Sequence, residues 1–177
     1  MVKIRPFEKR DQAAVYELVQ AGLKERWGEI FDPQYNRDLE DIQGFYLDTL
    51  RAIVVVMTED DDDQAIIGSG ILFPLPAPNV FGSWRDDDAD AGSGDSKKVT
   101  DVGECRMTRV SIVPGRRGQG LSKMIVRHLI EQGRLQGRKR ILVETTKGWE
   151  SAIGLYRALQ FEVVHEDDEC LHFKLDL

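Results

Sequence analysis

The stretch that decides the fold is VSIVPGRRGQGLSKMIVRHLI, residues 110–130. It begins with an apolar, β-branched run that ends at Pro114 and is typical of a buried strand. A turn of arginine and glycine follows, and apolar residues then recur at the spacing of one helix face. These residues are Leu121, Met124, Ile125, Leu129 and Ile130. The stretch therefore predicts a strand, a tight turn and an amphipathic helix in direct succession.

The turn has the composition of an anion-binding site. Gly118 and Gly120 carry no side chain where the helix begins, so a ligand can approach the backbone closely. The first N–H groups of a helix have no partner within it and carry the positive end of its dipole. Arg116 and Arg117 add two cations. We expect the turn to bind a phosphate, although glycine turns also serve as plain connectors before helices.

Two common phosphate-binding motifs do not fit this turn. A P-loop needs a lysine directly after its last glycine, where Leu121 stands. A dinucleotide fingerprint that starts at Gly118 needs a third glycine at the position of Lys123. Nucleoside triphosphate hydrolysis and dinucleotide binding are therefore disfavoured.

The rest of the chain places this unit in a mixed α/β sheet. Strand-like runs lie at residues 2–6, 52–57, 65–73, 99–113, 140–144, 161–165 and 170–175, and helix-like runs lie at 11–23, 36–50, 120–135 and 151–159. A length of 177 residues predicts a single α/β domain over residues 1–177. Residues 74–98 interrupt the pattern with proline, aspartate, glycine and serine, which predicts a mobile acidic insertion.

Composition narrows the partners and the setting. A net charge of −7 disfavours binding to nucleic acid or to an anionic membrane. There is no run of apolar residues long enough for a membrane span, and the N-terminus lacks the apolar core of a signal peptide. Two cysteines are too few for a disulfide framework. We therefore expect a cytoplasmic protein.

Two motifs make the chain resemble the GNAT acetyltransferases. RGQGLS at 117–122, which follows Ile112-Val113-Pro114, resembles the family's R/Q-x-x-G-x-G/A signature. SAIGLYRALQFEVV at 151–164 resembles the family's A-x-x-L-Y-x-x-x-G-F segment. The order of the elements and the length also agree, so the resemblance covers nearly the whole chain.

Three positions depart from the family pattern. Ser122 replaces a glycine or alanine but is small, so the turn should be kept. Gln160 replaces a glycine and affects the end of a helix rather than the chemistry. Trp149 stands where many members carry an asparagine that contacts cofactor or substrate, and that role is not carried over to it.

The resemblance implies a GNAT-like fold, in which a largely antiparallel central sheet is flanked by helices and splayed between two strands, here 99–113 and 140–144. It also implies acetyl-CoA as the acyl donor. The pantetheine arm would follow the strand edge at Val110, Ser111 and Ile112. The pyrophosphate would lie on the backbone amides of Arg117, Gly118, Gln119, Gly120, Leu121, Ser122 and Lys123.

Acyl transfer to an amine needs a base for the amine and an acid for the leaving thiolate. Glu104 lies on the long strand, where several family members hold the base, and the alternative is an exposed strand carboxylate without a role. Tyr156 matches the family's tyrosine near the thioester sulfur and is the candidate acid, with a structural core tyrosine as the alternative. Glu144 is the second choice for the base.

Other side chains receive weaker assignments. Cys105 has no base beside it in the sequence, so a covalent intermediate is not expected. Cys170 and His172 share one strand face, but two ligands make no structural metal site, and no metal is expected. The acceptor pocket is expected around the first two helices. Its candidate aromatic residues, for which ordinary packing is the alternative, are Trp27, Phe31, Tyr35 and Tyr46.

The sequence thus predicts an acetyl-CoA-dependent N-acetyltransferase that acts on a primary amine of a small molecule or peptide. Two alternatives stay open. One is a non-catalytic acyl-CoA-binding regulatory module, and the other is an interaction module whose acidic insertion binds a basic protein. The expected partners are acetyl-CoA and an amine that the sequence does not name, and a homodimer is left open.

Overall fold

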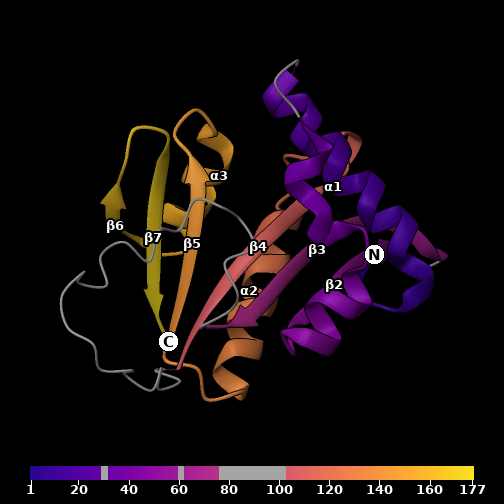
Figure 1. Ribbon diagram of the computed structural model, residues 1–177, viewed down its shortest axis with the longest axis horizontal. Helices are drawn as coiled ribbons and strands as arrows, with labels where there is room; N and C mark the ends of the chain where they lie inside the picture. The colour runs from indigo at the N-terminus through magenta and orange to yellow at the C-terminus, as the bar shows by residue number, and fades with distance from the viewer. Residues whose placement is uncertain (29–31, 60–61, 76–102) are drawn as a thin grey trace.

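The computed structural model describes residues 1–28, 32–59, 62–75 and 103–177 (Figure 1). Its strands are β1 (Val2–Pro6), β2 (Ile53–Glu59), β3 (Asp62–Pro74), β4 (Glu104–Ile112), β5 (Arg140–Thr146), β6 (Glu162–Glu166) and β7 (Cys170–Asp176). Its α-helices are α1 (Gln12–Trp27), α2 (Leu121–Leu135) and α3 (Glu150–Ala158). Shorter elements are the 3₁₀ helices η1 (Lys9–Asp11), η3 (Pro33–Leu39) and η6 (Pro114–Arg116) and the π-helix η4 (Gln43–Thr49). Apart from Pro74 and Leu75, the predicted insertion at 74–98 lies outside the described residues. Within the described ranges, no helix combines the length and the apolar character needed to cross a bilayer.

The seven strands form one sheet in the order β1-β2-β3-β4-β5-β7-β6. Neighbouring strands are antiparallel except β4 and β5, which are parallel and are joined through α2. A parallel pair needs such a crossover connection, whereas the antiparallel pairs need only turns. The mixed, largely antiparallel sheet that the sequence predicts is confirmed.

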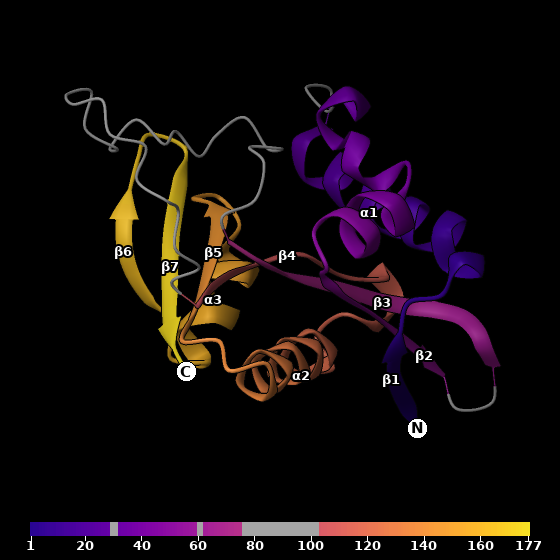
Figure 2. The ribbon, with the colours of Figure 1, turned by 60° about the horizontal axis from the view of Figure 1, so that its bottom comes forward.

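Helices cover both faces of the sheet (Figure 2). α2 and α3 pack on one face, and α1, η3 and η4 lie against the other. Each face of the sheet has its own hydrophobic core, and alternating side chains of β2 contribute to both. Val55 and Met57 point to the α2 side, whereas Val54 and Val56 point to the α1 side. A strand buried on both faces is apolar throughout, which explains the unbroken β-branched run in the sequence.

Two glycines of β3 allow α2 to lie close to the sheet. A Cβ added to Gly68 would lie 2.9 Å from Cδ1 of Ile125, and one added to Gly70 would lie 2.6 Å from Cγ2 of the same α2 residue. Ile125 and Leu129 are fully buried on the face of α2 that meets β3. The position of α2, and of the turn before it, therefore depends on the absence of side chains at these two glycines.

The segment predicted as a helix at residues 36–50 is helical but not continuous, because it divides into a 3₁₀ helix, η3, and a π-helix, η4. η3 starts earlier than predicted, with Pro33 in its first position and the Asp32 carboxylate accepting a hydrogen bond of 2.9 Å from the Gln34 N–H. The backbone then leaves helical geometry at Asn36, with φ −126° and ψ 33°. Asn36, predicted as the cap of the helix, therefore lies inside the first turn.

A side chain of α1 holds the break between the two turns. The Gln12 amide donates to the carbonyl of Leu39 at 2.7 Å and accepts from the N–H of Ile42 at 2.9 Å. These bonds satisfy two backbone groups that a continuous helix would have paired internally. Leu39, Ile42, Tyr46 and Leu50 are nevertheless buried, as their spacing predicted.

Replacing Gly70 by valine is expected to lower the free energy of unfolding by about 1–3 kcal/mol, because the branched side chain must displace Ile125 from β3. Gly154→Ala is the matched control, since the Cβ position of Gly154 in α3 has no described atom within 4 Å. Alanine there should be neutral or stabilising by roughly 0.5–1 kcal/mol. Denaturant unfolding measures both variants against the parent. Equal stability of Gly70→Val and the parent would contradict the close packing of α2 on β3.

Candidate active site

The central feature of the site is the separation of β4 from β5. The two strands pair only over residues 104–106 of β4 and 140–142 of β5. Beyond these pairs β4 continues along β3 and β5 along β7, so the facing edges part (Figure 1). A cleft of about 750 Å³ borders both edges and is also lined by α1, α2 and α3.

One side of the cleft is formed by the turn at the start of α2. Gly118 and Gly120 both adopt left-handed backbone geometry, with φ 75° and 76°, and Gly120 is the N-cap of α2. No described atom lies within 4 Å of the Cβ position of either glycine. This open space beside the first N–H groups of a helix has the form of an anion cradle.

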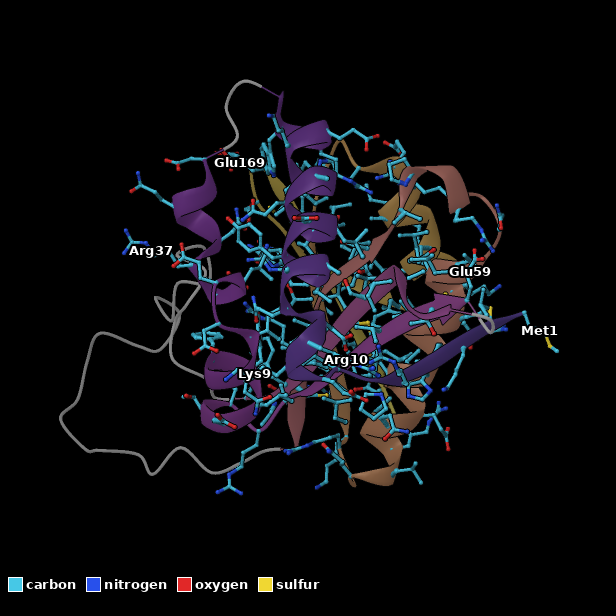
Figure 3. All side chains as sticks on the ribbon, turned by 90° about the vertical axis from the view of Figure 1, so that its right-hand side faces the viewer. Met1, Lys9, Arg10, Arg37, Glu59 and Glu169 are labelled. Atoms are coloured by element: carbon cyan, nitrogen blue, oxygen red, sulfur yellow. The ribbon has the colours of Figure 1, made fainter. Side chains whose placement is uncertain are left out.

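Most of the residues predicted to bind the acyl donor border the cleft. Val110, Ser111, Ile112, Arg117, Gly118, Leu121 and Ser122 line it, whereas Gln119, Gly120 and Lys123 do not. The Arg117 guanidinium donates to the carbonyl of Ile112 at 3.1 Å and pairs with Glu25 of α1 at 2.7 Å. Arg116 also lines the cleft and pairs with Glu59, at the end of β2 (Figure 3). Both cations are therefore held beside the glycine turn.

A β-bulge in β4 lies next to the cleft. Ile71 of β3 faces Thr108 and Ser69 faces Ser111, so β4 carries one more residue than β3 over this interval. Arg109, within the bulge, has a positive φ of 55°, which is uncommon for a residue other than glycine. A bulge redirects the side chain that it carries. Here it directs Arg109 towards η3.

Arg109 takes part in a buried polar network. Its guanidinium donates to both carboxylate oxygens of Asp38, at 2.7 and 3.1 Å, and to the side-chain oxygen of Asn36 at 2.7 Å. The Tyr46 hydroxyl donates to Asp38 at 2.6 Å. Burial raises the pKa of Tyr46 far above its usual value, and the negative charge of Asp38 acts in the same direction. The network fixes η3 and η4 to the bulged part of β4.

The aromatic residues predicted for the acceptor pocket are placed differently. Trp27 lines the cleft. Tyr46 is fully buried within the polar network, so its assignment to the pocket is wrong. Phe31 and the side chain of Tyr35 lie outside the described residues.

Tyr156 lies where the core meets the cleft. The residue is 6% exposed and lines the cleft from α3. Its ring packs against Phe161 and Phe173, with centroids 5.4 and 5.7 Å away. Burial raises the pKa of Tyr156 to about 12, although the positive charge of Arg26 acts in the opposite direction. The hydroxyl is therefore protonated at neutral pH, as a proton donor must be.

The structure does not bring Glu104 to the cleft. Its carboxylate pairs with Arg140 at 2.9 Å, at the end of β4 where the strand is still hydrogen-bonded to β5. Ile112, at the opened end, lies eight residues further on, which in an extended strand is roughly 26 Å. The position of Glu104 therefore does not support the predicted role as base.

Glu144 is the carboxylate that β5 presents to the cleft. It lies beyond the last pair with β4, lines the cleft and has a 22% exposed side chain. One carboxylate oxygen lies 3.8 Å from Nδ1 of His172. Burial raises the pKa of the neighbouring Cys170 thiol to about 12, and the negative charge of Glu144 acts in the same direction.

The last turn of α1 reaches across to α3. The helix extends one turn beyond the predicted range 11–23 and ends at Trp27. The rings of Trp27 and Trp149 meet edge to face, with centroids 5.6 Å apart. The guanidinium carbon of Arg26 lies 4.6 Å from the centroid of the Trp149 ring. All three residues line the cleft, so α1 and the N-terminus of α3 share one wall.

Three residues of this arrangement were not identified from the sequence. Arg26 and Asp38 lie in polar stretches without a motif, so no signal pointed to them. Trp149 was noted only as a departure from the family pattern. That departure was the available signal, because a large aromatic residue at a position that usually contacts ligand alters the shape of the site.

Comparison with known proteins assigns the family. Residues 13–161 match the acetyltransferase (GNAT) family. A GNAT-family acetyltransferase of Staphylococcus aureus Mu50 has a similar structure, with a TM-score of 0.76 and 15% identity over 100% of this chain and 99% of that one. So does yncA of Salmonella typhimurium, solved with acetyl-CoA, with a TM-score of 0.69 and 17% identity over 99% of this chain and 94% of that one. The uncharacterized N-acetyltransferase YjgM of Escherichia coli K12 is 40% identical over 58 residues, 33% of this chain and 35% of that relative, so the match spans about a third of the relative's length.

The chain belongs to the acetyltransferase (GNAT) family. This confirms the predicted family and the predicted enzyme class, an N-acetyltransferase. The similar structures confirm the predicted fold. Acetyl-CoA is the acyl donor of this family.

Asp38→Ala is expected to lower the free energy of unfolding by about 3–5 kcal/mol, because the buried Arg109 guanidinium loses its counter-charge. Tyr46→Phe is the control, since it removes one hydrogen bond to the same carboxylate and should cost about 0.5–1.5 kcal/mol. Denaturant unfolding compares the two variants. A loss for Asp38→Ala no larger than that for Tyr46→Phe would contradict the central place of this ion pair.

Proposed function

We propose that the protein transfers an acetyl group from acetyl-CoA directly to a cationic primary amine of a small molecule or peptide. One observation carries the proposal: a single cleft is bordered both by the glycine turn of α2 and by three carboxylates. These are Asp32, Glu144 and Glu169. Glu169, labelled in Figure 3, directly precedes β7 and borders the cleft from the β6–β7 hairpin. The cleft thus offers adjoining sites for an anionic donor and a cationic acceptor.

The residues of the donor side fit acetyl-CoA, which supplies a thioester activated for attack by an amine. The N–H groups at the start of α2 would bind the pyrophosphate, beside Arg116 and Arg117. The edge of β4 at residues 110–112 has parted from β5 and would pair with the pantetheine amides as a missing neighbour strand. The open space at Gly118 lets the phosphate approach the backbone.

Glu144 is the proposed base. An amine that binds as its ammonium form must lose a proton before its nitrogen can attack a carbonyl carbon. Glu144 borders the cleft from the parted section of β5, whereas Glu104 is held by Arg140 at the closed end. Glu144 would accept that proton and orient the amine.

Tyr156 is the proposed acid. Tyr156 borders the cleft, and its hydroxyl, with a pKa raised by burial to about 12, keeps its proton at neutral pH. A leaving thiolate would take that proton, and the hydroxyl would regain one from solvent. The positive charge of Arg26 would stabilise the transient phenolate.

Direct transfer is favoured over an acyl-enzyme intermediate. Burial raises the pKa of Cys105 and of Cys170 to about 12, so both thiols are protonated at neutral pH. The thiolate is the reactive form of cysteine. Neither cysteine is therefore activated as a nucleophile.

The acceptor side of the cleft suits a cation. Its carboxylates attract an ammonium group, and the Trp27 ring offers an aromatic face to it, whereas the Trp149 ring is already in contact with Arg26. The net charge of −7 gives the whole molecule the same preference for a cation.

A panel of amines incubated with acetyl-CoA tests the proposal through coenzyme A release and the mass of the product. Release that depends on a cationic amine is expected, whereas acetyl-CoA binding without amine-dependent release would indicate a non-catalytic module.

Gly118→Val should abolish stabilisation by acetyl-CoA, because the side chain fills the space above the N–H groups of α2. At 100 times its dissociation constant, the donor should raise the unfolding free energy of the parent by ~2.7 kcal/mol. Gly137→Val is the control, since Gly137 also has a positive φ, 69°, and an open Cβ position, but lies beyond the end of α2. Thermal unfolding with and without acetyl-CoA measures both. A donor-induced shift that survives in Gly118→Val would exclude the glycine turn as the phosphate site.

Glu144→Gln should lower kcat/KM for the amine about 10²–10⁴-fold, because the general base is lost. The loss should shrink as the pH approaches the pKa of the amine, since a neutral amine needs no base. Glu104→Gln is the matched control and should leave the rate within about twofold. Steady-state rates across pH distinguish the two carboxylates. Equal losses in both variants, or none in Glu144→Gln, would exclude Glu144 as the base.

Tyr156→Phe should lower kcat roughly 10²-fold or more and leave the affinity for acetyl-CoA nearly unchanged, because only the proton donor is removed. Since the pKa of Tyr156 is about 12, the parent should lose no activity through its deprotonation below about pH 11. Pre-steady-state and steady-state kinetics measure these effects. Unchanged kcat in Tyr156→Phe would show that the residue is structural.

A further inference from the structure

The β6–β7 hairpin brings three metal-ligating side chains together outside the acyl-transfer residues. His165 on β6 lies opposite His172 on β7, with ring centroids 5.2 Å apart. Asp167 follows β6 in the connecting turn, and its Oδ2 lies 2.8 Å from Nε2 of His172. One ligand atom from each of the three residues lies within 4.8 Å of the other two.

The backbone of the hairpin holds two of these ligands in place. Oδ1 of Asp167 accepts hydrogen bonds from the N–H groups of Glu169 and Cys170, at 2.9 and 2.8 Å. These bonds fix the carboxylate and leave Oδ2 directed at His172. His172 is only 4% exposed, so the surrounding strands restrict its ring. His165 is exposed, so the surrounding strands do not enclose its ring.

A fourth residue supports the buried histidine from its other side. Oε2 of Glu144 lies 3.8 Å from Nδ1 of His172. Metal-bound histidines typically donate their second ring N–H to a carboxylate, which orients the ring and strengthens the metal bond. With Nε2 directed at the ligand cluster, Nδ1 lies on the side of Glu144, and their separation of 3.8 Å would have to shorten for a hydrogen bond to form on metal binding.

We propose that His165, Asp167 and His172 form a binding site for one divalent transition-metal ion of the zinc or nickel type. Two imidazoles and one carboxylate suit such ions, whereas Ca²⁺ and Mg²⁺ prefer oxygen ligands alone. Zinc–ligand bonds are about 2.0–2.2 Å long, so the three ligand atoms of a zinc complex must lie somewhat closer together than 4.8 Å. Rotation of the exposed His165 side chain would close that difference. The sequence predicted no metal because only Cys170 and His172 share a face of one strand; pairing with β6 adds the remaining ligands.

None of the three ligands is a proposed acetyl-transfer residue, although Glu144 lies next to both sites, so the metal site can be tested by binding alone. Isothermal titration of the full chain with ZnCl₂ should give one Zn²⁺ per chain, and MgCl₂ should give no binding. His165→Ala and Asp167→Asn should each weaken Zn²⁺ binding at least about 10-fold. Asparagine keeps the oxygen that caps the turn, and His165 is exposed, so both variants should melt like the parent without metal.

His128→Ala is the matched control, because His128 lies on α2 away from the hairpin. It should bind Zn²⁺ as the parent does. Absence of Zn²⁺ binding to the parent would overturn the proposal. So would binding that His165→Ala leaves unchanged, and this variant alone decides the question if Asp167→Asn fails to fold.

Discussion

Pairing between β4 and β5 ends after three residue pairs, at Arg106 and Leu142, and the rest of the site depends on that early end. Beyond it, the backbone groups on the two facing edges are not paired with each other. Such an edge can bind an extended ligand that carries its own amides. α2, which connects the two strands and packs closely on Gly68 and Gly70 of β3, also carries the glycine turn. The fold thereby places an unpaired strand edge beside a helix N-terminus.

The polar network behind the bulge links the two substrate sides of the cleft. Arg109 has a positive φ, a conformation that costs a non-glycine residue free energy unless surrounding contacts hold it. Asp38 and Asn36 supply these contacts, and Asp38 also receives the Tyr46 hydroxyl. η3 and η4, which we propose lie on the acceptor side, are thus anchored on the strand that is proposed to bind the donor. We infer that the distance between donor and acceptor is fixed by this network.

The sequence predicted the order of strands and helices and the glycine turn, because these depend on local periodicity and on residues within one turn. It could not predict the break at residues 36–50, which depends on hydrogen bonds from Gln12 in another helix. It ranked Glu104 above Glu144 as the candidate base, because a strand pattern does not reveal where pairing with the next strand ends. Trp149 and the ligands around His172 likewise meet their partners only through tertiary contacts.

The central claim is that acetyl-CoA binds along the parted edge of β4. Backbone hydrogen exchange, measured with and without acetyl-CoA, tests it most directly. The account predicts slower exchange in residues 110–112 and at the start of α2 when the donor is bound. Residues 104–106, already paired with β5, should exchange at an unchanged rate. Protection confined to other segments, with residues 110–112 unaffected, would contradict the account.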